Sequence, residues 1–270
     1  MSTSETRLTL LGTQGWIPTI LRHTTSLALE HRDALLLFDA GTGLSRLLRP
    51  PLATAVRAAR ELHLFLTHYH LDHTCGLAYL SGVVGQRRLT VHVPADTLNG
   101  VDPAAGVPAL LRPPFHPASW EEHSLYRLDV MDAGEHEVAG LPVRLRAQCH
   151  ADVSVAYRVG DLFVLATDTV ADPGTAAFAA GAELLLHEAW IDGVEEEDPT
   201  QRELVRRTYA SHSSARQAAA LARDAGVAEL YLMHLNPLFD EDYYLRMEAA
   251  AQARFAATSV PADLHVRVFS

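Results

Sequence analysis

Short apolar runs separated by polar turns recur along the whole chain. They are rich in aliphatic residues and bounded by turn-forming residues, a pattern typical of buried strands. The predicted strands are Leu8–Leu11, Ala34–Phe38, Leu62–Leu66, Leu89–Val93, Val143–Ala147, Leu162–Ala166, Leu184–Leu186 and Leu230–Met233.

Helical patterns lie between some of these runs. The clearest is Ser214–Ala225, where Ser214 and Gln217 fit a capping box and Gly226 follows an alanine-rich body as a stop signal. Further helices are predicted at Thr74–Leu80, Pro173–Ala180 and Asp240–Phe255. The proline-rich stretch Pro103–Pro117 predicts a long loop. Strands dominate early and α/β alternation follows, which predicts two sheets covered by helices in one α/β domain, residues 1–270.

Five of the apolar runs lead directly to polar residues that can do chemistry. In α/β sheets, functional sites gather outside the carboxyl ends of strands. We therefore expect these strand ends to build one site. The residues are His68, His150, Asp168, His187 with Glu188, and His234.

The densest cluster is Thr67-His68-Tyr69-His70-Leu71-Asp72-His73. In extended chain, His68 and His70 point the same way and can bind one ion. A helix starting near Thr74 would redirect Asp72 and His73 towards a second ion. Imidazole and carboxylate donors suit Zn²⁺, and also Mn²⁺ or Fe. The remaining ligands are expected among His150, Asp168 and His234, and the two carboxylate oxygens of Asp168 allow it to bridge both ions.

This pattern resembles the signature of the metallo-β-lactamase-fold superfamily, H-x-H-x-D-H followed by a distant His, Asp and His. The segment Leu36–Gly43 resembles the Asp-Gly turn that supports the site in that family. The resemblance implies a four-layer αββα sandwich with two mixed β-sheets flanked by helices. It also implies a ligand set for two divalent ions, zinc being favoured: His68, His70 and His150 for one, Asp72, His73 and His234 for the other, and Asp168 bridging.

Two further segments resemble the ribonuclease Z-like branch of that superfamily. His187-Glu188-Ala189-Trp190 is similar to its H-E-A-T motif, with Trp190 in place of Thr, and Ser211-His212-Ser213 is similar to its H-S-T motif. The resemblance implies a metal-dependent phosphodiesterase in which Asp72, Glu188 and His212 are catalytic. A metal-bridging hydroxide would attack phosphorus, and His212, oriented by Glu188, would protonate the leaving oxygen.

The spacing of the motifs bears on the substrate. Only 17 residues separate His150 from Asp168, whereas ribonuclease Z proper inserts its tRNA-clamping arm there. A net charge of −11 also disfavours a nucleic-acid partner. We therefore expect a small or cyclic phosphodiester substrate. The alternatives are a ribonuclease Z-like tRNA 3′-processing endonuclease, a lactone or thioester hydrolase on the same fold, and a metal-dependent sensor without turnover.

Composition adds a few expectations. Apolar residues make up 48% and charged residues 20% of the 270-residue chain, as in globular proteins. No apolar run approaches a membrane span and the N-terminus lacks the apolar core of a signal peptide, so a cytoplasmic protein without a membrane partner is expected. A homodimer is common in the family it resembles.

Several residues near the motifs have no assigned role. Cys75 and Cys149 are expected to be buried small side chains rather than ligands, because His and Asp already supply enough donors. The basic residues Arg87, Arg88, Arg202, Arg206 and Arg207 are expected on solvated faces. Whether His116 and Arg112 of the proline-rich stretch contact substrate is left open.

Overall fold

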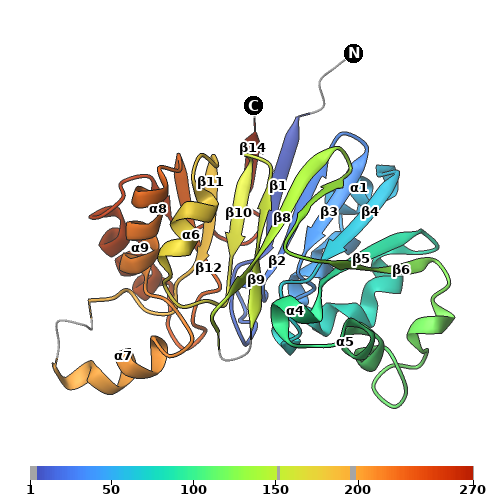
Figure 1. The fold of residues 1–270 in the computed structure, drawn as a ribbon, viewed down its shortest axis with the longest axis horizontal. Helices are drawn as coiled ribbons and strands as arrows, with labels where there is room; N and C mark the ends of the chain where they lie inside the picture. Colours follow the sequence, from blue (N-terminus) through green and yellow to red (C-terminus); the bar gives the residue numbers. More distant parts are fainter. Residues whose placement is uncertain (1–4, 151–152, 195–198, 270) are drawn as a thin grey trace. The chain divides into compact units, whose positions relative to one another are not determined.

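The computed structural model describes residues 5–150, 153–194 and 199–269, which form two compact units. The first unit contains residues 1–13, 17–132 and 262–270, and the second contains residues 14–16 and 133–261. Each unit has a mixed seven-stranded sheet with flanking helices (Figure 1). Two mixed sheets flanked by helices were expected from the resemblance, and they are confirmed. The single domain over residues 1–270 stays a prediction.

The sheet of the first unit has the strand order β14-β1-β2-β3-β4-β5-β6. Its strands are β1 Thr6–Gly12, β2 Ser26–His31, β3 Ala34–Phe38, β4 Glu61–Phe65, β5 Leu89–Pro94, β6 Tyr126–Met131 and β14 Val266–Phe269. Its helices are η1 Thr42–Leu48, α1 Leu52–Ala58, α2 Leu71–Thr74, η2 Cys75–Tyr79, α3 Leu80–Val84, α4 Asp96–Asn99, α5 Pro103–Leu110 and η3 Trp120–Glu122.

Alternation along β3 and β4 builds the core of this unit. Leu35 and Leu37 of β3 lie on one face of the sheet, together with Leu62 and Leu64 of β4. All four are buried in a cluster with apolar residues of η1, α1 and α3. The two strands run parallel, with Phe38 paired to Phe65 at their carboxyl ends. The residues that follow β3 and β4 therefore begin at the same edge of the sheet.

The sheet of the second unit has the order β13-β12-β11-β10-β9-β8-β7. Its strands are β7 Glu135–Val138, β8 Leu141–Gln148, β9 Ser154–Val159, β10 Phe163–Ala166, β11 Leu184–Glu188, β12 Glu229–Met233 and β13 Thr258–Ser259. Its helices are α6 Pro173–Ala179, η5 Pro199–Gln201, α7 Arg202–Thr208, α8 Ala215–Ala225 and α9 Glu241–Gln252.

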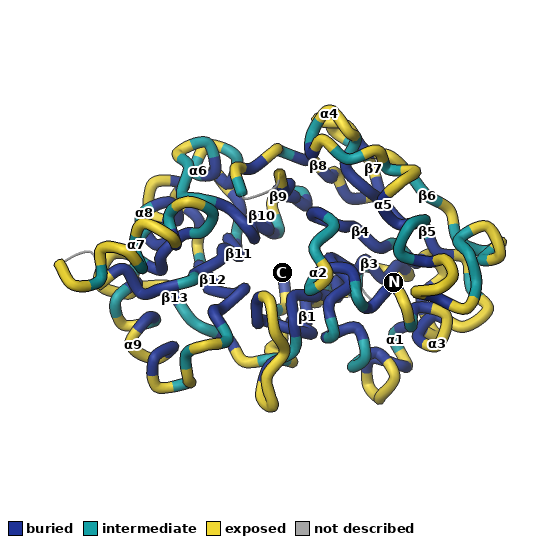
Figure 2. The backbone as a smooth tube through the Cα atoms, turned by 90° about the horizontal axis from the view of Figure 1, so that it is seen from below, coloured by how far each residue is buried: buried dark blue, intermediate teal, exposed yellow. Residues whose placement is uncertain are grey.

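Parallel pairing of β10, β11 and β12 brings three polar strand ends to one edge of this sheet. Helix α8 begins at the capping box of Ser214 and Gln217 and ends at Gly226, as predicted. Its alanine face packs against β11 and β12, and α6 and α9 lie beside it (Figure 1). Burial is deepest along the strands, whereas α7 is largely exposed (Figure 2).

Two predicted elements differ from the structure. Pro103–Pro117 is not a loop throughout, because Pro103–Leu110 forms helix α5. The Asp102 side chain caps it by accepting from the Ala104 N–H at 2.9 Å, and Pro103 fits the first helical turn.

The helix predicted at Thr74–Leu80 is instead three short helical segments, α2, η2 and α3, and the first begins at Leu71. The Gly76 N–H donates to the Ala40 carbonyl at 2.7 Å instead of to its own helix, which interrupts a continuous α-helix.

The cysteine prediction was wrong for one residue and only partly right for the other. Cys149 is exposed and Cys75 is half-buried, and both are free thiols.

Across the described residues, no helix has both the length and the hydropathy that crossing a membrane requires.

A chain of hydrogen bonds crosses β4, β5 and β6 in the first unit. His63 Nδ1 lies 2.9 Å from His92 Nε2, and His92 Nδ1 lies 2.9 Å from Asp129 Oδ2. Asp129 accepts, so His92 donates from Nδ1 and, when neutral, accepts from His63 at Nε2. Burial lowers the pKa of His92 to about 4, against the opposing charge of Asp129. Glu61 and Arg127 flank the chain.

This pKa predicts acid sensitivity of the fold. A histidine whose pKa is lower in the folded protein than its value of roughly 6.5 in the unfolded chain favours folding in its neutral form. Its full contribution to stability is present above pH 6.5 or so. That stabilisation, up to about 3 kcal/mol, is lost as the pH falls from 6.5 towards 4. The variant His92→Gln keeps a donor for Asp129 and an acceptor for His63 but cannot titrate. Urea unfolding across this range should show a smaller loss of stability for His92→Gln than for wild type, and equal losses would contradict the assignment.

Candidate metal centre and catalytic residues

The first unit brings His68, His70, Asp72 and His73 together immediately after β4. The His68 ring centroid lies 4.4 Å from that of His70 and 4.4 Å from that of His73. Asp72 and His73 occupy the first turn of α2, where His73 Nε2 lies 3.4 Å from Asp72 Oδ2. We call these four residues the β4 set.

Asp39, at the end of β3, holds the β4 set in place. Its fully buried carboxylate accepts from the Thr67 N–H at 2.8 Å and the Thr67 hydroxyl at 2.9 Å. It also accepts from His73 Nδ1 at 2.8 Å. In the neutral imidazole this bond leaves the lone pair on Nε2, directed to the side of Asp72. A carboxylate that orients a histidine in this way is typical of metal sites.

Helix α5 supports the same segment from another direction. Gly106 of α5 lies against Tyr69, and a Cβ at Gly106 would come within 2.4 Å of the Tyr69 ring. Burial raises the pKa of Tyr69 to about 12, with a further contribution from the Asp102 charge. Tyr69 separates His68 from His70 in the sequence, so the unexpected helix packs on the motif itself.

The second unit brings together His150, Asp168 and His234, which we call the Asp168 set. Asp168 Oδ1 lies 3.5 Å from His150 Nε2 and 3.2 Å from His234 Nε2. Its other oxygen, Oδ2, accepts from the Thr167 hydroxyl at 2.7 Å. Convergence of these strand-end residues within the unit follows from the parallel strands, as the sequence predicts.

The donors of the Asp168 set fit a cation. His150 Nδ1 lies 2.7 Å from the Ser211 carbonyl, so it carries a proton and donates it. Burial lowers the pKa of His150, which favours the neutral ring. A neutral His150 then directs a lone pair from Nε2 towards a carboxylate oxygen, so two acceptors face each other. A divalent metal ion between nitrogen and oxygen donors removes this repulsion, and these donors suit zinc.

Asp39 and two members of the Asp168 set share an uncommon backbone conformation. Asp39, Asp168 and His234 have φ values of 57°, 53° and 49°, each just after a strand. Asp and His enter this left-handed region more often than most residues, at a cost of about 1–3 kcal/mol each. The turn swings each side chain away from the direction of its strand, which is how strand ends become a site.

Gly15 was missed by the sequence analysis. Its N–H donates to the Leu235 carbonyl at 2.9 Å, next in the chain to His234. A Cβ at Gly15 would lie 2.6 Å from Cε1 and 2.8 Å from both nitrogens of that ring. Only the absence of a side chain at position 15 allows His234 to lie there, and no motif in the sequence indicates this contact.

Glu188, His212 and Trp190 form a second cluster in this unit. His212 Nδ1 lies 2.7 Å from Glu188 Oε2, and the other Glu188 oxygen accepts from the Thr169 N–H. Glu188 is fully buried, while the His212 side chain is 16% exposed. Glu188, His212 and His234 each offer a donor atom within 4.8 Å of the others. Both Glu188 oxygens already accept hydrogen bonds, which favours Glu188 as the partner of His212 over Glu188 as a ligand.

The side chains of the other polar residues selected from the sequence are not among the grouped donors of the described residues. His187 is fully buried on β11, with Nδ1 2.9 Å from the Glu188 carbonyl, and burial lowers its pKa. His116 is buried, and its Nδ1 lies 2.7 Å from the Ala118 carbonyl. Arg112 is exposed. Packing within its own segment therefore accounts for His116.

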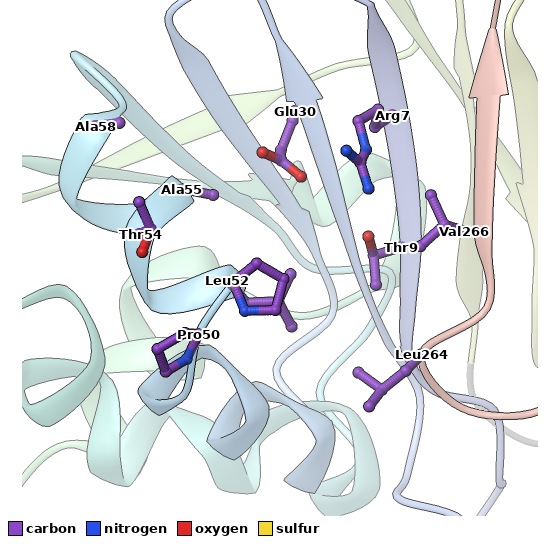
Figure 3. Close-up of a pocket in the computed structure, with 11 residues that line it drawn as sticks. Arg7, Thr9, Glu30, Pro50, Leu52, Thr54, Ala55, Ala58, Leu264 and Val266 are labelled. Atoms are coloured by element: carbon purple, nitrogen blue, oxygen red, sulfur yellow. The ribbon is translucent and has the colours of Figure 1, made fainter.

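A pocket of about 600 Å³ lies elsewhere in the first unit (Figure 3). Arg7 and Glu30, opposite each other in the β1–β2 register, line one part of it, and apolar side chains such as Leu52, Leu264 and Val266 line the rest. None of the residues selected from the sequence lines this pocket, so it plays no part in the site.

Comparison with known proteins decides the family. The beta-lactamase superfamily domain matches residues 35–235, about three quarters of the chain. The chain belongs to the metallo-β-lactamase superfamily. It is a metal-dependent hydrolase with nuclease and phosphodiesterase relatives.

The relatives span the whole chain. Ribonuclease BN of Escherichia coli O6:K15:H31 (strain 536 / UPEC) is 25% identical, with 96% of this chain and 98% of that protein covered. Among solved structures, the metallo-beta-lactamase fold protein YhfI from Bacillus subtilis has a TM-score of 0.73 at 18% identity, covering 98% and 100% of the two chains.

Two further structures share the fold of this superfamily member. A diphosphatase of the PhnP family has a TM-score of 0.67 at 15% identity, covering 98% of this chain and 97% of the other. Zn²⁺-bound PqqB from Methylobacterium extorquens has a TM-score of 0.63 at 17% identity, covering 97% and 99%.

The contact between Gly15 and His234 predicts the effect of one methyl group. Gly15→Ala should displace the His234 ring and weaken metal binding by about tenfold or more, as loss of ligand-orienting contacts does. Gly82→Ala is the matched control, because no atom lies within 4 Å of a Cβ at Gly82. Metal affinity is measured by competition with a chelator. Equal affinity of wild type and Gly15→Ala would show that the ring position does not matter for binding.

Proposed function

We propose that this protein is a dinuclear phosphodiesterase that acts on a small or cyclic phosphodiester. The β4 set and the Asp168 set would together hold two divalent ions, zinc being favoured by the His and Asp donors. His68, His70 and His150 would bind one ion, Asp72, His73 and His234 the other, and Asp168 both. The superfamily match, which spans residues 35–235 and so includes both sets, supports this assignment.

The hydrogen bond between Glu188 and His212 carries the proposal. When bound, the ions supply Lewis acidity and an activated water. Glu188 holds the proton on His212 Nδ1, so that Nε2 is the nitrogen that faces substrate. A protonated Nε2 can donate to the leaving alkoxide, which is poor at leaving as an anion. Hydrolysis of a β-lactam or a lactone does not by itself explain a buried carboxylate that orients a second histidine.

The connection between His150 and Asp168 supports a small substrate. Strands β9 and β10 form an antiparallel pair and occupy most of the 17 intervening residues. The net charge of −11 also disfavours a polyanionic partner. Neither feature favours a large polyanion as the substrate.

The similarity to ribonuclease BN favours a second candidate, an RNA-processing nuclease with the same catalytic residues. Assays on bis-p-nitrophenyl phosphate, 2′,3′-cyclic nucleotides and precursor tRNA, each with Zn²⁺ or Mn²⁺, separate the two candidates. Cleavage of precursor tRNA at rates above those on the small substrates would replace the proposed substrate class. Turnover only on a parallel lactone and thioester panel would replace phosphodiester chemistry altogether.

Removal of the proposed proton donor should affect turnover and not metal content. His212→Ala is expected to lower kcat on a 2′,3′-cyclic nucleotide by about 100-fold or more, the usual contribution of a general acid. The kcat of Glu188→Gln on the same substrate is expected to lie between that of His212→Ala and that of wild type. His265→Ala, at an exposed histidine of the first unit, is the matched control.

Elemental analysis accompanies the kinetics of these variants. Full metal content with lowered kcat in His212→Ala supports a proton donor. Loss of a metal ion in that variant would instead make His212 a ligand, and unchanged kcat would remove it from the reaction.

A further inference from the structure

The aromatic residue at position 190 lies directly on the proposed proton donor. The indole and His212 rings have centroids 4.3 Å apart and planes that differ by 7°, so the two rings are stacked. The same indole lies 5.6 Å from the His234 ring, at 28°. Trp190 is half-buried at the end of β11, where the similar motif of other branch members has Thr.

The backbone fixes Trp190 beside His212. The Trp190 N–H donates to the Ser213 carbonyl at 2.9 Å, and Ile191 forms a parallel β-bridge with Ser214. These bonds join the segment after β11 to the segment that carries His212. The stacking is therefore built on two backbone segments that are held together, rather than on one mobile side chain.

The hydrogen bond to Glu188 alone does not fix the His212 ring. A hydrogen bond at Nδ1 sets the position of that atom but lets the ring tilt about it, which moves Nε2. A parallel indole covers one face of the imidazole and resists this tilt, and stacked aromatic pairs of this kind gain free energy beyond the area that they bury. The His150 ring is a further neighbour, with its centroid 5.0 Å from that of His212 and its plane at 65° to it. A threonine at position 190 would offer no such flat surface.

We propose that Trp190 is a positioning residue, which holds the plane of His212 so that Nε2 meets the leaving-group oxygen. The inference rests on the proposed phosphodiesterase function. In that reaction an oxygen from water bonds to phosphorus, and the bond from phosphorus to the leaving oxygen breaks with its electron pair. The leaving oxygen takes the proton of His212 Nε2, and the proton released by the water restores it. Trp190 takes no part in bond making.

Two substrates with different leaving groups test this role. Bis-p-nitrophenyl phosphate releases a stable phenolate that needs no proton, whereas a 2′,3′-cyclic nucleotide releases an alkoxide that does. Trp190→Leu is expected to lower kcat on the cyclic nucleotide by about tenfold to 100-fold, and on bis-p-nitrophenyl phosphate by less than about threefold. KM and metal content should stay near the wild-type values. Trp190→Phe keeps a flat ring and should retain most of the activity on both substrates.

Trp190→Thr and Trp120→Leu complete the set. Trp190→Thr, which restores the residue of the similar motif, should behave like Trp190→Leu. Trp120→Leu, at a half-buried tryptophan of the first unit, controls for the general loss of an indole. Equal losses on both substrates, loss of metal, or a Phe variant as impaired as the Leu variant would each overturn the positioning role. Absence of wild-type turnover on both substrates would instead overturn the proposed function, and this inference with it.

Discussion

The arrangement of acceptors around Asp168 is the constraint on which the rest of this structure depends. One carboxylate oxygen lies 3.5 Å from His150 Nε2 and 3.2 Å from His234 Nε2, and the proton of His150 is held on its far nitrogen by a carbonyl. Burying such groups together is costly unless a cation lies among them. The β4 set shows the same arrangement, because Asp39 accepts from His73 Nδ1 and leaves Nε2 on the side of Asp72. Metal binding therefore explains polar groups that would otherwise destabilise each unit.

Strand topology is what makes this arrangement possible. In each unit, parallel strands end at a common edge, and a residue with positive φ directs the side chain there: Asp39 after β3, Asp168 after β10 and His234 after β12. The apolar strands supply the stability that tolerates about 1–3 kcal/mol of strain at each of these positions. Two glycines allow a side chain of the site to approach the backbone closely: Gly15 lies against His234, and Gly106 lies against Tyr69. Buried strands thus act as a scaffold for short polar segments whose conformations are unfavourable in isolation.

Most of the strands and the strand-end residues were predictable, because apolar runs and the polar residues that follow them are local features of the sequence. Helix α8 was predictable for the same reason, since Ser214, Gln217 and Gly226 mark both of its ends. Helix α5 was not, because five prolines and a glycine between positions 103 and 117 concealed the cap provided by Asp102. The role of Gly15 could not be predicted, since it depends on a ring 219 positions away in the sequence. Trp190 was visible as a departure from a motif, but its stacking on His212 is a property of the fold alone.

The central proposal is that the β4 set and the Asp168 set would hold two metal ions, with Asp168 as a shared ligand. The most direct measurement is the number of divalent ions per chain, by elemental analysis of protein purified without added metal, for wild type and for Asp168→Ala. The account predicts two ions per wild-type chain and one or fewer in the variant, because removing a shared ligand weakens both positions. A single ion in the wild-type protein, or two ions retained in Asp168→Ala, would contradict it.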